Sequence, residues 1–321
     1  DCPLTNAGVG SNLNFDGNVE CDASIMDGQT NHFGAIAALQ GIRNPIVVAK
    51  KLVEEQNILY PSGRVPPMFL CGEGAHDWAI KHGVIGVSRQ SLVTDKSLRS
   101  YKKYFKCSQE EENSLSLRKK RKLDDEERLL DTVGAVCVDK DGNICSGVSS
   151  GGVLLKYPGR IGQAAVYGAG CWASNITKNC PVGIACSSSG CGEELIKTLL
   201  CKECADLCAE SQDGRTALQE LLQNKFLDSP RLSCTDTKQG GIILLKSQID
   251  HSSELQKMKV DFSWAHTTQT MAVGYMAVQD QTPEFQLSRL EAADVAGCAI
   301  QTRGIVLTQE LPRLREKNNP S

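Results

Sequence analysis

Long hydrophobic runs are lacking in this sequence of 321 residues. No stretch approaches the roughly 18 or more apolar residues that a membrane-spanning helix requires. The first residues, Asp1-Cys2-Pro3-Leu4, also lack the basic region and the apolar core of a secretory signal. We therefore expect a protein that neither spans nor crosses a membrane. Its content of 40% hydrophobic and 23% charged residues is enough to bury a large core.

An excess of charge of one sign is also lacking, because 35 Lys and Arg residues stand against 38 Asp and Glu residues. Such a balance gives no field for wrapping nucleic acid or for coating an anionic membrane, so we expect neither as a partner. Histidine is scarce, with five residues in the chain. We expect these to be structural, and His266 is the one that we would test as a conventional general base.

Cysteine is plentiful by contrast, and the chain holds 15, an odd number. Several lie inside apolar segments, which differs from the turn-rich framework of a disulfide-bonded secreted domain and indicates the reducing cytosol or nucleus. Cys201, Cys204 and Cys208 have the spacing of one helix face, so together they could hold a metal ion. A structural zinc site requires a fourth ligand, and cysteine is common in cores. We therefore expect core packing there, with no metal and no cofactor.

The first part of the chain has the signals of ordinary helices and strands. Short apolar runs between turn residues predict strands within 11–39. Asn44-Pro45 provides an N-cap followed by a proline at the first helical position, which predicts a helix from Pro45 to about Gln56. A second helix is predicted over Glu73–Lys81, ended by His82-Gly83.

The middle of the chain, from about residue 88 to residue 131, is mostly polar. The basic pentamer Arg118–Lys122 is followed closely by four acidic residues at 124–127, so no buried face can be drawn. We expect a long exposed segment, partly disordered or partly solvated helix. The pentamer is typical of a nuclear import signal and equally of a solvated charge run, and the import reading would place the protein in the nucleus as well as the cytoplasm.

Alternating hydrophobic residues return at Thr132. The pattern predicts a strand over Thr132–Val138, a turn centred on Asp141-Gly142 and a second strand over Ile144–Ser150, which together form a hairpin. We therefore divide the chain into 1–131 and 132–321, two parts of one composite domain. A threonine that opens a core strand after a long exposed segment marks a place where the chain could be cut without disturbing the fold.

A cut between Asp131 and Thr132 would leave Thr132 with a free α-amine. A hydroxyl is a poor nucleophile until a base removes its proton, and an α-amine with a reference pKa of roughly 7.7 to 8 can be that base at neutral pH. Thr132 would then act as nucleophile and base together, an arrangement that needs neither histidine nor metal.

Seven short motifs occur in the order seen in the plant-type (type 2) asparaginase family, which this chain resembles. They are Asn6–Ser11, Asp22–Gly28, Gly72–Ala75, Thr132–Val136, Ser149–Gly152, Pro158–Gly162 and Gly190–Glu193. The resemblance implies a four-layer αββα sandwich of the N-terminal-nucleophile hydrolase type. It also implies a precursor cleaved into an α subunit ending at Asp131 and a β subunit beginning at Thr132, with two such αβ heterodimers pairing. Family members carry an earlier strand and helix, so we expect part of the α subunit to be missing from this sequence.

The same resemblance implies roles for individual residues. Ser150 matches a hydroxyl that supports the nucleophile, and Arg160 matches the arginine that grips a substrate carboxylate. Ser189 and Gly190 stand where the family binds substrate and stabilises the oxyanion, with a hydroxyl and a backbone N–H. Asn6 matches the asparagine that completes the oxyanion hole. Two alternatives stay open, since Arg160 could be a surface residue of a Pro-Gly turn and Asn6 part of a structural turn.

One position departs from the amino-acid-hydrolysing members of the family. Gln163 stands where they carry an aspartate that pairs with the substrate's free α-ammonium, and a neutral amide cannot supply that charge. We therefore expect the substrate to be an aspartate inside a polypeptide, which fits the aspartate directly before Thr132. The resemblance to an aspartate-directed protease branch of the family implies nuclear substrates, including trithorax-type histone methyltransferases and the transcription factor IIA precursor.

Two other functions remain open from sequence. An asparaginase or isoaspartyl peptidase would keep the fold and Thr132, and the residue at position 163 together with assays on free asparagine would distinguish it. A binding module without enzymatic activity would use the polar middle segment as a docking arm, and for it the change Thr132→Ala would have no measurable effect.

Overall fold

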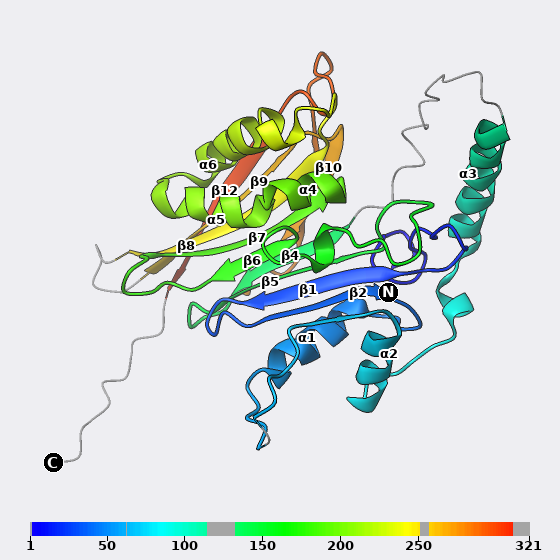
Figure 1. Ribbon diagram of the computed structural model, residues 1–321. Helices are drawn as coiled ribbons and strands as arrows, with labels where there is room; N and C mark the ends of the chain where they lie inside the picture. The colour runs from blue at the N-terminus through cyan, green and yellow to red at the C-terminus, as the bar shows by residue number, and fades with distance from the viewer. Residues whose placement is uncertain (1, 62, 114–131, 251–256, 311–321) are drawn as a thin grey trace.

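Two five-stranded sheets pack face to face, and helices cover the outer face of each (Figure 1). The computed structural model describes residues 2–61, 63–113, 132–250 and 257–310. The expected αββα sandwich is therefore confirmed. Among the described residues, no helix is both long and apolar enough to cross a membrane.

The first sheet has the strand order β3-β2-β1-β5-β4, so it combines strands from both sides of Thr132. Its strands are β1 (Cys21–Asp27), β2 (Phe33–Leu39), β3 (Phe69–Cys71), β4 (Val133–Val138) and β5 (Ile144–Ser150). Neighbouring strands are antiparallel except for β2 and β3, which are parallel. Its outer face is covered by α1 (Pro45–Glu55) and α2 (Gly72–Lys81).

The second sheet has the order β12-β9-β8-β7-β6 and is built entirely from the part of the chain after Thr132. Its strands are β6 (Cys171–Ser174), β7 (Val182–Gly190), β8 (Gly240–Asp250), β9 (Lys257–His266) and β12 (Gln301–Glu310). Its outer face is covered by α4 (Gly192–Thr198), α5 (Leu200–Glu210) and α6 (Gly214–Glu220). A separate two-stranded sheet joins β10 (Thr270–Tyr275) to β11 (Glu284–Arg289).

Short helical segments complete the described chain, together with one longer helix, α3 (Asp95–Asn113). The short segments are η1 (Arg89–Leu92), η3 (Gln163–Ala165), η4 (Leu221–Leu227) and η5 (Pro230–Leu232). The two early helices and the hairpin are confirmed, within one or two residues of the predicted bounds.

Apolar side chains fill the space between the sheets and the space beneath each helical layer. The central core joins Phe33 and Ile144 of the first sheet to Ala185 and Met258 of the second. Under the helices of the second sheet, Cys201, Cys204 and Cys208 are fully buried in a large apolar cluster. Core packing at these three cysteines is thus confirmed.

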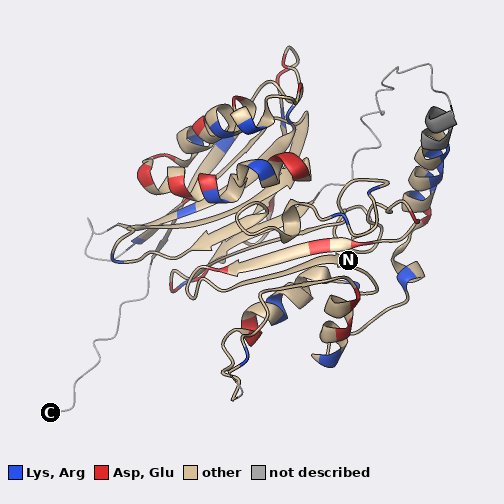
Figure 2. Ribbon diagram, viewed as in Figure 1, with Lys and Arg blue, Asp and Glu red and all other residues tan. Residues whose placement is uncertain are grey.

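The polar middle was expected to be exposed, partly disordered or partly solvated helix, and its described part does contain a helix, but the expectation that no buried face can be drawn is wrong for this part. Helix α3 has an apolar face, because Leu98, Tyr101 and Phe105 follow helical spacing. The Phe105 ring packs on that of Phe15 with a centroid separation of 5.2 Å, and the Tyr101 hydroxyl donates to the Phe15 carbonyl over 3.0 Å. Lys and Arg residues recur along α3 (Figure 2). The candidate import signal Arg118–Lys122 lies outside the described residues.

Candidate active site

The β4–β5 hairpin brings Thr132 beside Ser150. Antiparallel pairing sets Val133 opposite Ser149, so the residues that flank this pair also lie side by side. The Thr132 hydroxyl donates to Ser150 Oγ over 2.9 Å, and Ser150 Oγ also accepts from the Gly152 N–H over 3.1 Å. The candidate nucleophile therefore has a partner that is itself held by the backbone. Asp131, the other side of the expected cut, lies outside the described residues.

Gln163 reaches the same hydroxyl from the η3 turn. Its side chain is buried, with 2% of the residue exposed, and Nε2 donates to Thr132 Oγ1 over 3.4 Å. Sequence reasoning identified Gln163 as a substrate-recognition residue and did not anticipate this direct contact with Thr132. The amide end of Gln163 therefore lies where it could meet both the nucleophile and a bound substrate.

Arg160 makes a two-point ion pair with Glu193, at the start of α4. Nε donates to Oε1 over 2.8 Å and Nη2 donates to Oε2 over 2.5 Å. The Arg160 side chain is 15% exposed while that of Glu193 is 55% exposed, which disfavours the reading of Arg160 as a surface residue. The hydrogen bonds from Arg160 hold the pKa of Glu193 below its usual range, so the carboxylate is charged at neutral pH. Glu193 lies in a motif noted in the sequence, but no role for it was foreseen.

Glycines allow the recognition side chains to crowd together. A Cβ added at Gly192 would lie 2.7 Å from Arg160 Nη2 and 3.0 Å from Gln163 Oε1. A Cβ at Gly152 or Gly162 would lie 2.9 Å or 3.0 Å from Arg160 Nη1. The guanidinium is therefore walled by backbone at its Nη1 end, and its Nη2 corner faces the Gln163 amide across Gly192.

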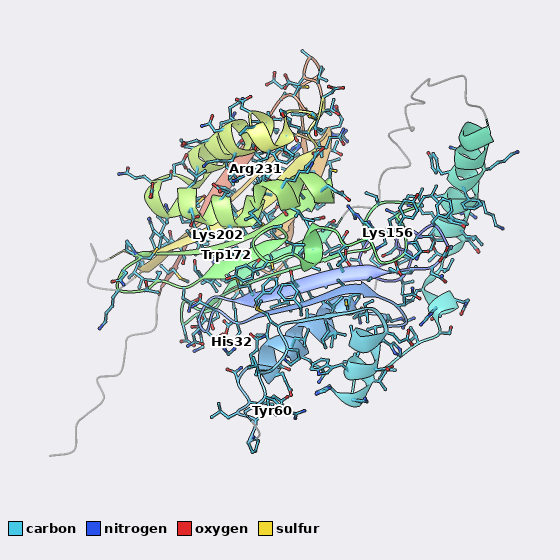
Figure 3. The ribbon with its side chains drawn as sticks, in the orientation of Figure 1. His32, Tyr60, Lys156, Trp172, Lys202 and Arg231 are labelled. Carbon is cyan, nitrogen blue, oxygen red and sulfur yellow. The ribbon has the colours of Figure 1, made fainter. Side chains whose placement is uncertain are left out.

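Asp22 is a site residue that sequence reasoning did not single out. It is fully buried on β1, where Oδ1 accepts the Ala38 N–H over 2.8 Å and Oδ2 accepts the Gly162 N–H over 2.7 Å. Burial raises its pKa, and the charge of Lys156 opposes that rise. Lys156 lies in the loop beside the start of β1 (Figure 3), and its Nζ donates to the Glu20 carbonyl over 2.8 Å. The signal in the sequence that could have identified Asp22 as a site residue is a charged side chain within a mostly apolar strand.

Ser189 and Gly190 end β7, next to the hairpin. Ser189 and Thr132 line one small cavity of about 100 Å³. Gly190 has φ of +148°, and a Cβ there would lie 2.4 Å from the Gln239 carbonyl oxygen, so this position requires glycine. The end of β7 thus opens onto the candidate nucleophile.

Two other candidate residues have structural partners. The Asn6 amide donates to the Gly152 carbonyl over 2.8 Å, and its oxygen accepts the Asn12 N–H over 3.1 Å, as expected of a structural turn beside the site. His266 is fully buried, and its ring nitrogens lie 2.8 Å from the Thr268 carbonyl and 2.9 Å from the hydroxyl of Ser288. The structure therefore gives His266 no contact with Thr132, and burial lowers its pKa.

Comparison with known proteins places these residues in a family. Residues 1–278 match the sequence profile of the family described as Asparaginase. The chain belongs to the plant-type asparaginase family. It is 35% identical over 256 residues to an isoaspartyl peptidase of Escherichia coli (strain K12), covering 79% of this chain and 70% of that protein. It is 36% identical over 219 residues to a plant-type L-asparaginase of Thermococcus kodakarensis, covering 68% of this chain and 65% of the relative.

A human relative of the asparaginase family, an isoaspartyl peptidase/L-asparaginase, is 36% identical over 202 residues, covering 63% of this chain and 57% of that protein. Membership in this family makes the chain a hydrolase of the N-terminal-nucleophile type. The arrangement around Thr132 suits that chemistry, since a hydroxyl lies at the start of a core strand with hydrogen-bonding neighbours on two sides.

Proposed function

We propose that this chain is a threonine aspartase (taspase), a threonine-type endopeptidase that cuts itself between Asp131 and Thr132 and then cuts other polypeptides after aspartate. The observation that carries the proposal is the contact of the neutral Gln163 amide with the Thr132 hydroxyl, at 3.4 Å. A substrate with a free α-ammonium would find no anion on that side chain, whereas a peptide N–H can donate to Gln163 Oε1.

Self-cleavage would begin with attack of Thr132 Oγ1 on the carbonyl carbon of Asp131. The hydroxyl proton ends on the peptide nitrogen, which leaves as a free amine when its C–N bond breaks, so the peptide bond becomes an ester, and water then hydrolyses this ester to a carboxylate and the free hydroxyl. Ser150 would hold the hydroxyl in line for attack, since the two oxygens lie 2.9 Å apart. The product is a β subunit with a free α-amine on Thr132.

In the mature enzyme that α-amine would take the Thr132 hydroxyl proton as Oγ1 attacks the carbonyl of a substrate aspartate. The backbone N–H of Gly190 would stabilise the oxyanion, and Asn6 would contribute if its amide turned from Gly152. The same proton would pass to the leaving amine as the C–N bond breaks. Water would then hydrolyse the acyl-enzyme. Arg160 would bind the side-chain carboxylate of the substrate aspartate, and Ser189 would bind the same carboxylate from the other side.

The proposal extends to partners and location. We propose nuclear regulatory proteins with an internal aspartate as substrates, trithorax-type methyltransferases and the transcription factor IIA precursor among them. The protein would act in the nucleus and cytoplasm, with Arg118–Lys122 as import signal, and as a pair of αβ heterodimers.

A second candidate is an isoaspartyl peptidase or asparaginase, and the names of the relatives fit it better than they fit an aspartate-directed protease. It would use the same Thr132 and Arg160. The two candidates differ in whether the α-amino group of the substrate is free, which is the group that Gln163 would face.

The first test is the intact mass of the purified protein with and without Thr132→Ala. We expect two fragments meeting at Asp131 and Thr132 in the unaltered protein and a single chain in the variant, because the variant lacks the attacking oxygen. A variant that is still cut at this bond would show that Thr132 is not the nucleophile.

The change Gln163→Asp separates the two candidates. A charged partner for an α-ammonium strengthens a hydrogen bond by about 1.5 kcal/mol, so we expect about a tenfold gain in kcat/KM for a β-aspartyl dipeptide and a loss on aspartate-containing peptides. Unaltered Gln163 protein that hydrolyses free asparagine but no internal aspartyl bond would support the second candidate instead.

A further inference from the structure

Arg160 is occupied in this structure, although it is the residue proposed to hold the substrate. Its Nε and Nη2 both donate to the Glu193 carboxylate, over 2.8 Å and 2.5 Å. Arginine offers a carboxylate two edges for a two-point grip, one made by Nε and Nη2 and the other by the two terminal nitrogens. Nη2 belongs to both edges.

The remaining edge of Arg160 is poorly placed to bind an incoming carboxylate. Its Nη1 end lies against Gly152 and Gly162, where an added Cβ would come within 2.9 Å or 3.0 Å of the nitrogen. A second carboxylate at Nη2 would also carry the same charge as Glu193 at close range, and like charges disfavour one another. At either edge of the guanidinium, a substrate carboxylate would therefore have to compete with the Glu193 carboxylate.

Of the two side chains in this ion pair, Glu193 is the one that can move away, because it is the more exposed. Its side chain is 55% exposed against 15% for Arg160, and it begins an outer helix, α4. Its carboxylate can leave the guanidinium and be hydrated instead. The free-energy cost is small, because exposed ion pairs stabilise a protein only weakly. Arg160, enclosed by glycine backbone, cannot withdraw in the same way.

We propose that Glu193 is an internal competitor that occupies the substrate-binding edge of Arg160 and must leave it before a substrate carboxylate binds. Glu193 thereby sets the affinity of the site for aspartate and keeps the guanidinium paired between turnovers. It acts through Arg160 and does not touch the substrate. This inference rests on the proposed role of Arg160, and the experiment separates the two.

The test is calorimetric titration of the full chain with N-acetyl-L-aspartate, which presents the carboxylate of aspartate and is not cut. We expect Glu193→Gln and Glu193→Ala to bind it about threefold to tenfold more tightly than the unaltered protein, since each removes the competing charge. Glu73→Gln is the matched control, because Glu73 pairs with Arg89 on the surface over 2.8 Å. This control should bind as the unaltered protein does.

Whether the Glu193 variants bind N-acetyl-L-aspartate more tightly or more weakly tests the proposal. If Glu193 instead orients Arg160 for the substrate, both Glu193 variants bind more weakly, and this outcome, or equal or unmeasurable binding, overturns the proposal. Arg160→Ala tests the proposed function separately. Binding that survives Arg160→Ala would remove the carboxylate-binding role of Arg160 altogether, whereas loss in Arg160→Ala without a gain in the Glu193 variants would remove the Glu193 proposal alone.

Discussion

At the scale of single residues, the recognition groups are arranged by what lies beneath them. Asp22 accepts one N–H from Ala38 and one from Gly162, so a single buried carboxylate ties the turn between Arg160 and Gln163 to the first sheet. Carboxylates can accept several hydrogen bonds at once, which an amide oxygen alone does less well. The turn is therefore positioned by a residue that no substrate would touch.

Gly192 gives the sharpest residue-scale prediction. Gly192→Ala would press a methyl group against Arg160 Nη2 and Gln163 Oε1, at 2.7 Å and 3.0 Å before relaxation. Crowding of this kind costs about 1–3 kcal/mol, so we expect KM for an aspartyl peptide to rise between about fivefold and a hundredfold. Gly74→Ala in α2 is the control, since nothing lies within 4 Å of its added Cβ. An unchanged KM in Gly192→Ala would show that these two side chains do not bind substrate together.

At the scale of elements, the β4–β5 hairpin carries both Thr132 and a pair of opposed cysteines. Cys137 pairs directly with Cys145 across the strands, and Cys137 is exposed. A hydrogen bond from the Cys145 thiol lowers the pKa of Cys137 to about 6. Thiolate is the reactive form, so the lowered pKa favours reaction at Cys137 over its partner Cys145, whose pKa is raised.

We predict that iodoacetamide alkylates Cys137 with a rate that rises with pH and is half-maximal near pH 6, the pKa of about 6. Cys145→Ala removes the donor and should move the half-maximum to higher pH, toward the ordinary thiol range. The rates are followed by peptide mass spectrometry. Identical pH profiles in the two proteins would contradict the prediction.

At the scale of the whole molecule, a cut before Thr132 would leave two chains that share one sheet. Strands β1 to β3 belong to the first chain and β4 and β5 to the second, joined along the β1–β5 ladder from Asp22 opposite Ser150 to Asp27 opposite Cys145. The central core likewise takes Phe33 from the first chain and Met258 from the second. The two cleaved chains would therefore stay joined by one continuous sheet and one shared core.

We therefore expect the two cleaved chains to migrate as one species in size-exclusion chromatography under native conditions. They should separate only in denaturant, because parting them exposes the central core to water. Denaturing mass spectrometry of the same peak provides the count of chains. Separation of the chains in native buffer would contradict the shared sheet.

Local features of this protein were determined by its sequence. The Asn44-Pro45 helix start, the Asp-Gly hairpin and the neutral residue at 163 could each be read from a few neighbouring positions, because capping, turns and strand alternation depend on nearby residues. The layered fold was predicted through the resemblance to the asparaginase family that the order of the motifs carries. Helix α3 marks the limit of this reasoning, since its apolar face became meaningful only against Phe15.

The tertiary structure alone decided how distant segments meet. The pairing of Arg160 with Glu193, the bridge from Asp22 to Gly162 and the contact of Gln163 with Thr132 each join residues from separate elements. No local pattern specifies such contacts, because they arise when the sheets and loops pack and bring together groups that hydrogen bonding and charge then hold in place.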